Sequence, residues 1–141
     1  MMSRAQVLLL QLGVALMTVT GLLFAWMKYF VKSADEFAVI NHPLQPWMLA
    51  AHVVIAPLAV FAFGWVFGPH IWPGIRKRNA PKRGSGLWTV IPLAPMIFSG
   101  YLLQVATADA TRHAMAIAHW LSSGIFVLGY VVHLAQGRSN E

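Results

Sequence analysis

The chain alternates long apolar runs, which carry charge only at their ends, with short polar segments. The apolar runs cover residues 6–28, 46–69, 87–107 and 112–135. At about 1.5 Å per residue, a helix of about 20 residues crosses the roughly 30 Å hydrocarbon core of a bilayer. The pattern therefore predicts an all-α membrane protein, with residues 1–141 forming a single domain built as a bundle of four transmembrane helices.

The first apolar run has a rival interpretation as a cleaved signal peptide, because Arg4 precedes an apolar core. The run is longer than such cores usually are, and no small-x-small cleavage site precedes the charged Lys28. The sequence therefore favours a retained membrane helix.

The polar segments predict how the chain is oriented. Residues 28–46 mix charges with prolines and are expected to form an external loop, whereas the loop at residues 75–84 carries five cations. These cations are Arg76, Lys77, Arg78, Lys82 and Arg83. Because cytoplasmic loops are enriched in Lys and Arg, we expect this loop and both termini to be cytoplasmic, with the basic side chains touching anionic membrane lipid.

Composition narrows the possible functions. Hydrophobic residues make up 58% of the chain and charged residues 10%, against about a quarter charged in soluble proteins. The net charge of +6 would suggest nucleic-acid binding in a soluble chain, but half of the cations lie in one loop, so no nucleic-acid partner is expected. Without cysteine there is no disulfide, thiolate metal site or covalent haem attachment. Four acidic residues, all outside the apolar runs, disfavour carboxylate catalysis by a stand-alone enzyme.

Histidines are the chemically unusual feature of the apolar runs. His52 and His70 lie near the two ends of the second run, and His119 and His133 lie in the fourth. These two helices should be parallel, so each carries one outer and one inner histidine. At about 100° per residue, the step from His52 to His70 returns to one face, and the step from His119 to His133 returns to within about 40°. Each helix is thus predicted to present one histidine stripe.

Two neutral imidazoles on facing helices suit the two axial positions of a haem iron. The macrocycle is apolar, and its electron chemistry needs no Asp, Glu or Cys from the protein. We therefore expect an outer iron between His52 and His119 and an inner iron between His70 and His133, which means two b-type haems, or at least one. Small residues on the same stripes would leave room for a macrocycle: Ala56, Ala59, Ser122 and Ser123.

The inner pair fits this geometry less well than the outer pair. In ideal helices the axial steps are about 27 Å from His52 to His70 and about 21 Å from His119 to His133, a mismatch of about 6 Å. Pro57 and Gly68-Pro69 interrupt the second run and can shorten or redirect its inner end.

Two alternatives remain open at this point. Intramembrane histidines also occur hydrogen-bonded to a neighbouring hydroxyl or carbonyl, which would make the protein a haem-free anchor or assembly subunit of a larger complex. A proton- or metal-conducting transporter is the weaker alternative, because no carboxylate accompanies the histidines within the apolar runs.

Further polar residues near the outer surface are candidates for secondary contacts. His42, Arg112 and His113 can hold haem propionates, and Tyr101 and Gln104 can contact a quinone. The simpler interpretation is that all five are ordinary interfacial polar residues.

The motifs NHP…AAH…GPH, SGYLLQVA and AHWLSSGIFVLGYVVH resemble those of small bacterial four-helix b-type cytochromes of the cytochrome b-561-like superfamily. This resemblance implies transmembrane electron transfer in the bacterial inner membrane, between a quinone pool and a redox partner such as a c-type cytochrome or another membrane oxidoreductase subunit. A homodimer is compatible with it. The protein would then be an electron carrier or a subunit of a membrane oxidoreductase. The 18-residue step from His52 to His70 departs from the 14-residue spacing of the related respiratory cytochromes b, which His119 and His133 do show.

Overall fold

The structure is a computed structural model that describes residues 2–35, 37–80 and 82–138. Over these residues it is helical throughout and contains no strand. Four helical runs are long and apolar enough to cross a membrane, namely Arg4–Tyr29, Gln45–Arg76, Arg83–Val105 and Asp109–Gln136. The prediction of an all-α chain with four membrane-length helices is therefore confirmed. The chain ends predicted to be cytoplasmic, Met1 and Glu141, lie outside the described residues.

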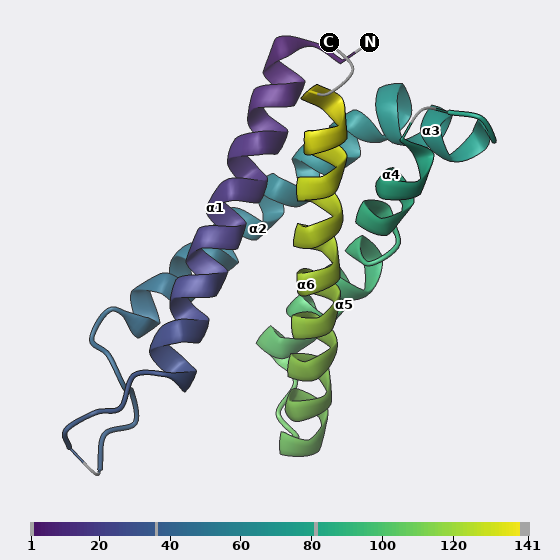
Figure 1. Cartoon of the computed structure of the whole chain (residues 1–141). Coiled ribbons are helices and arrows are strands. Elements are labelled where there is room, and N and C mark those ends of the chain that lie inside the picture. The colour runs from purple at the N-terminus through teal and green to yellow at the C-terminus, as the bar shows by residue number, and fades with distance from the viewer. Residues whose placement is uncertain (1, 36, 81, 139–141) are drawn as a thin grey trace. The chain divides into compact units, whose positions relative to one another are not determined.

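The chain divides into two compact units, Met1–Pro69 and His70–Glu141. In the first unit, α1 (Arg4–Tyr29) packs against α2 (Gln45–Val66) (Figure 1). The helices approach closely at Gly13, where a Cβ atom would lie 3.5 Å from the Cα of Ala59. Ala59 is accordingly buried against α1. The sequence placed this alanine beside a haem, and in the structure its neighbour is a helix.

The helical run that begins with α2 continues past the predicted end at residue 69. It passes through a π-helical segment, η1 (Phe67–Ile71), and ends in α3 (Trp72–Arg76). A proline in a regular α-helix removes one hydrogen bond and clashes with the carbonyl four residues earlier, so helices bend or widen around it. The wider π turn takes in Gly68 and Pro69 without ending the helix.

The second unit contains α4 (Arg83–Val90), α5 (Leu93–Val105) and α6 (Asp109–Arg138). A turn at Ile91–Pro92 separates α4 from α5, so the third apolar run is broken into two helices that both pack against α6 (Figure 1). The helices approach closely at Gly129 of α6, where a Cβ atom would lie 2.9 Å from the carbonyl carbon and oxygen of Trp88. Only a residue without a side chain fits there.

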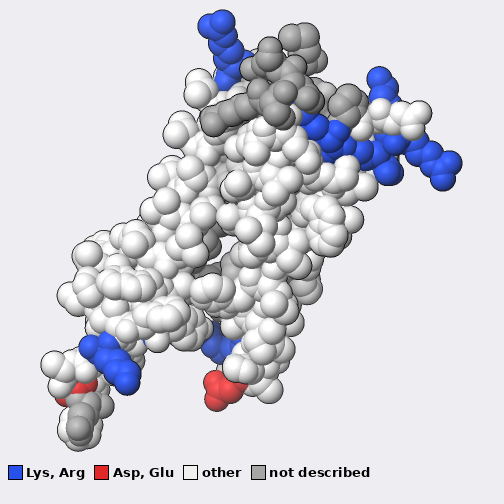
Figure 2. All heavy atoms as spheres, viewed as in Figure 1, with Lys and Arg blue, Asp and Glu red and all other residues white. Residues whose placement is uncertain are grey.

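On the face shown in Figure 2, Lys, Arg, Asp and Glu side chains lie near the ends of the long helices, and the surface between those ends carries none. At one end of the second unit, the Arg76 guanidinium lies 4.9 Å from the centre of the Trp72 ring, and Arg83 donates hydrogen bonds of 3.4 and 3.5 Å to the carbonyl of Ile75. At the start of α6, Arg112 donates to the carbonyls of Leu103 and Ala106, where α5 ends. This distribution is the one a bilayer imposes on helices that cross it.

Candidate functional site

Three of the four histidines predicted to bind haem have the same surroundings. Each imidazole lies against a Ser or Thr followed by Gly on a neighbouring helix, an arrangement we call a hydroxyl–glycine step. The hydroxyl lies near Nδ1 of the histidine, and the glycine lies beside the ring. The steps are Thr20-Gly21 for His52, Ser99-Gly100 for His119 and Ser85-Gly86 for His133.

In the first unit, Oγ1 of Thr20 lies 3.0 Å from Nδ1 of His52. The same hydroxyl donates its one proton to the carbonyl of Leu16 at 2.7 Å. Its oxygen therefore accepts from Nδ1–H, which leaves the basic lone pair of the neutral ring on Nε2. A Cβ at Gly21 would lie 3.0 Å from Cε1 of His52, so the glycine makes room for the ring.

In the second unit, Nδ1 of His119 lies 2.9 Å from the carbonyl oxygen of Met96. A carbonyl can only accept, so Nδ1 carries the proton and Nε2 is again the basic nitrogen. The hydroxyl of Ser99 is at 3.4 Å and uses its own proton on the carbonyl of Pro95. The ring lies tightly against Gly100, where a Cβ would be 2.9 Å from Cε1.

His133 has the third such environment. Oγ of Ser85 lies 3.1 Å from its Nδ1 and has two oxygen acceptors for its single proton, the side chain of Gln136 at 2.7 Å and the carbonyl of Lys82 at 3.1 Å. Ser85 therefore accepts from Nδ1–H of His133. The contact with Gly86 is looser, since a Cβ there would lie 3.6 Å from Cε1.

These hydrogen bonds fix both the tautomer and the orientation of three imidazoles. Histidines that bind metals through Nε2 characteristically donate Nδ1–H to a nearby oxygen, which makes the ring a stronger ligand. The same bonds also satisfy an imidazole in apolar surroundings, as the haem-free alternative requires. The geometry therefore suits ligation, and the hydrogen bonds alone fit either interpretation.

His70 differs from the other three and lies beside His133. It is an exposed residue in the π-helical segment, its ring centre is 6.0 Å from that of His133, and the ring planes are inclined at 68°. Two imidazoles on opposite sides of one metal, each about 2 Å from it, have ring centres roughly 6 Å apart. The structure thus brings together the two residues predicted for the inner site. His52 and His119 belong to different units, and each is described with the partners of its own unit.

The secondary candidates have structural contacts or lie on the surface. Nδ1 of His42 accepts from the backbone N–H of Leu44 at 3.1 Å, just before α2 begins, and Arg112 holds the end of α5. His113, Tyr101 and Gln104 are exposed. Among the residues that the structure describes, no group of three or more His, Cys, Asp or Glu side chains could hold a bare metal ion.

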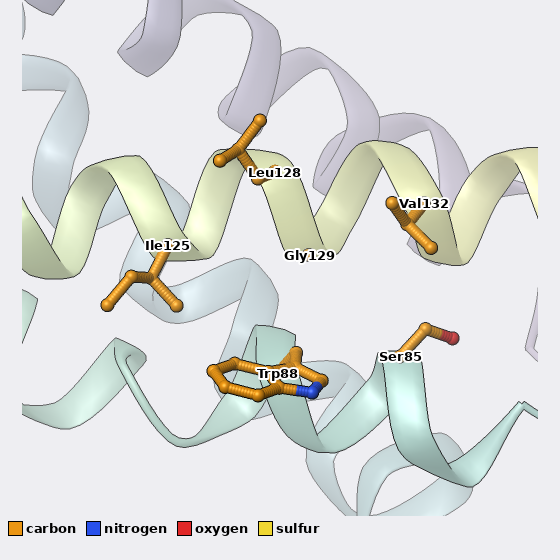
Figure 3. A pocket seen from close by; sticks show the side chains of 6 residues that line it. All are labelled: Ser85, Trp88, Ile125, Leu128, Gly129 and Val132. Atoms are coloured by element: carbon orange, nitrogen blue, oxygen red, sulfur yellow. The ribbon is translucent and has the colours of Figure 1, made fainter.

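A pocket of about 300 Å³ lies between α4 and α6, beside the contact of Ser85 with His133. Figure 3 shows its lining residues, with Ser85 and Trp88 on α4 opposite Gly129 on α6. Ile125, Leu128 and Val132 complete the lining. The residues predicted to contact a quinone, Tyr101 and Gln104, are not among those that line this pocket.

The hydroxyl–glycine steps were missed by sequence reasoning, although the sequence contains a signal for them. A Ser or Thr directly before Gly occurs at four places, residues 20–21, 85–86, 99–100 and 123–124. The first three face a histidine, and nothing lies within 4 Å of a Cβ placed at Gly124. The signal becomes specific only once the helix pairing is known.

Fold and site together define a helical, membrane-type protein in which histidines on two of the long helices are hydrogen-bonded at Nδ1 to a neighbouring helix. Comparison with protein-family models, with curated proteins and with solved structures finds no match for this chain.

Proposed function

We propose that this protein is a b-type cytochrome of the bacterial inner membrane, which passes electrons across the bilayer between a quinone pool and a redox partner protein. The observation that carries the proposal is the pairing of His70 with His133, whose ring centres lie 6.0 Å apart. His133 is also held in the tautomer that leaves Nε2 basic. His70 would supply the second imidazole of the histidine pair that holds a b-type haem.

The chain's own residues would hold the group as follows. His70 and His133 would hold an inner haem, and His52 and His119 are the candidate ligands of an outer haem. When bound, haem supplies one-electron chemistry that the side chains alone do not have. Thr20, Ser85, Ser99 and the carbonyl of Met96 hold the imidazole protons at Nδ1, and the apolar helices exclude water from the rings.

The spacing on α6 supports a carrier that works across the bilayer. His119 and His133 are 14 residues apart in one helix, about 21 Å along its axis. Two sites at these levels would span much of a hydrocarbon core that is roughly 30 Å thick.

The proposal is tested by optical spectroscopy of the purified full-length protein in mild detergent, after expression with sufficient haem. We expect a b-type reduced-minus-oxidised spectrum and, by the pyridine haemochrome assay, two haems per chain. Protein that is folded by circular dichroism but shows no b-type signal would overturn the proposal in favour of the haem-free anchor.

Single histidine variants assign the sites. His133→Ala and His70→Ala should each remove one haem and leave the other, because both residues are proposed to serve the inner iron. Val131→Ala is the matched control, since Val131 is an exposed residue on the same helix, two positions before His133. Full haem content in both inner variants would show that the inner site is wrongly assigned.

A further inference from the structure

The pocket between α4 and α6 adjoins cations that the proposed function does not use. We propose that the pocket and these cations together form a site for one anionic phospholipid, with an acyl chain in the pocket and the phosphate at Lys82 and Arg83. Every residue of this site belongs to the second unit. The proposal is independent of haem and goes beyond the proposed function.

The pocket suits hydrocarbon. Its surface is formed by apolar atoms, and its volume of about 300 Å³ is at the lower end of the range for small-molecule sites. Ser85, a polar residue in the lining, uses its hydroxyl on Gln136 and His133 instead. A ligand held there is therefore stabilised by van der Waals packing rather than by hydrogen bonds.

The pocket also has the direction and the opening that an acyl chain needs. Its lining residues on α6, from Ile125 to Val132, cover about 10 Å of a helix that is long enough to cross a membrane (Figure 3). Lipid chains run along such a helix. Trp88 on α4 and Leu128 on α6 are 65% and 70% exposed, so a chain can enter from the surface without separating the helices.

The end of the pocket at Ser85 is positively charged. The Ser85 hydroxyl lies 3.1 Å from the carbonyl oxygen of Lys82, and Lys82 and Arg83 are the N-cap and the first residue of α4. Arg83 donates to the carbonyl of Ile75 through two of its three nitrogens. A guanidinium has five N–H donors and favours phosphate, so Arg83 can bind a phosphate as well.

Among the described residues of the second unit, no carboxylate lies near these cations. The acid in this part of the chain is Asp109, which begins α6 and is 24 residues from His133, the residue that Ser85 contacts. At about 1.5 Å per residue, the separation is roughly 36 Å along the helix. The phosphate of a lipid supplies the missing negative charge.

The pocket and the cations together select the class of ligand. A free phosphate would leave the pocket empty, and an uncharged quinone would leave the cations unpaired. An anionic phospholipid joins a phosphate to hydrocarbon chains, and it is a component of the bilayer that such helices cross.

The experiment titrates delipidated full-length protein with phosphatidylglycerol or with phosphatidylcholine of identical acyl chains, and counts bound lipids by native mass spectrometry. We expect one phosphatidylglycerol to bind roughly 25-fold more tightly than phosphatidylcholine, from about fivefold for each of two cations. Glycerol 3-phosphate, which has the phosphate without the chains, should not displace it at equal concentration. Equal binding of the two lipids, or displacement by glycerol 3-phosphate, would overturn the proposal.

The Lys82→Gln/Arg83→Gln variant tests the contact with the headgroup. It should lose the preference for phosphatidylglycerol, whereas Lys77→Gln/Arg78→Gln removes the same charge from exposed positions of the same loop and should keep most of it. An equal loss in the two double variants would show a diffuse attraction and no defined site. Lys82→Gln alone keeps the bonds of Arg83 and should lose about fivefold, in case the double variant does not fold.

Val132→Trp tests the pocket, because a large side chain there fills the space for the acyl chain. Val131→Trp is the matched control, since Val131 is 57% exposed on the same helix and does not line the pocket. The first variant should bind roughly 5- to 100-fold more weakly, the range that overpacking usually costs, and the second should bind as the wild type does. Unchanged binding in folded Val132→Trp, or an equal loss in Val131→Trp, would remove the acyl chain from the pocket. The titration applies to protein with or without haem, so its outcome is separate from that of the proposed function.

Discussion

At the scale of single residues, glycines position the histidine rings together with the hydroxyls, because they leave room for each ring against the neighbouring helix. The tightness of that packing differs among the three steps. A Cβ would lie 2.9 Å from the ring at Gly100, 3.0 Å at Gly21 and 3.6 Å at Gly86. The first two distances require the ring to move, and the third is an ordinary contact.

We therefore expect Gly100→Ala and Gly21→Ala to displace their imidazoles and to destabilise the fold by about 1–3 kcal/mol, the usual range for overpacking. Gly86→Ala should have little effect. Thermal unfolding in detergent, followed by tryptophan fluorescence, measures the difference. An equal loss in all three variants would mean that ring packing is not its cause.

A second prediction concerns the crossing of α4 and α6. At Gly129 the added Cβ would meet backbone atoms of Trp88, which cannot rotate away as a side chain can. Gly129→Ala should thus force the helices apart and destabilise the protein by at least about 1–3 kcal/mol. Gly124→Ala, on the same helix with no neighbour within 4 Å, is the control and should leave the unfolding temperature unchanged or slightly raised.

At this scale the sequence singles out the histidines, but it does not predict which groups form hydrogen bonds with them. The histidines are conspicuous because they interrupt apolar runs. Their partners lie 20 to 48 residues away along the chain, so a contact such as Ser85 with His133 depends on how α4 packs against α6. Ser-Gly and Thr-Gly are also ordinary packing dipeptides in membrane helices, which makes them uninformative without that pairing.

At the scale of helices, the π-helical segment decides where His70 lies. Gly68-Pro69 and Pro73-Gly74 predict the end of a helix by their composition, yet the helical run continues to Arg76. The prolines and glycines predict where the regular α-helix is interrupted. They do not predict whether the helix ends, bends or widens there, because a proline can cause any of the three depending on its surroundings. The same limit applies to the turn at Ile91–Pro92, which divides a continuous apolar run.

Pro69→Ala tests the role of this segment. Without the proline ring, the segment can return to a regular α-helix, in which the residues that follow turn by roughly 100° for each residue of the π turn that is lost. We expect His70 to move away from His133. Because the chain has no cysteine, a His70→Cys/His133→Cys pair can report the distance through a short bifunctional thiol-reactive cross-linker, which spans more than a disulfide does.

Cross-linking of this pair should be efficient in the parent and much weaker with Pro69→Ala. Pro57→Ala is the control, since Pro57 lies inside the regular part of the same run. Undiminished cross-linking with Pro69→Ala would show that the π-helical segment does not depend on its proline.

At the scale of the whole molecule, the number of membrane-length helices follows from the sequence because hydropathy is a local property. Each run contains its own evidence, and all four are helical in the structure. Orientation remains a prediction, based on the five cations between residues 75 and 84.

Single cysteines test that orientation. Arg78→Cys should react with a membrane-impermeant maleimide only in inverted vesicles, and Val39→Cys only in right-side-out vesicles or intact cells. Val39 lies in the opposite polar segment and is 98% exposed, so access to its side chain does not limit the reaction. Labelling of both variants from the same side would contradict the four-span topology.

The hydroxyl–glycine steps of the second unit also fix how α4 and α5 are aligned along α6. Ser85 and Ser99 are 14 residues apart, as are their partners His133 and His119 on α6. In hydrocarbon, apolar helix faces alone distinguish poorly between one alignment and the next, because lipid solvates them all equally well. A shift of one turn would separate both imidazoles from their hydroxyls at once. The two contacts together therefore favour a single alignment of the helices, whether or not a cofactor is bound.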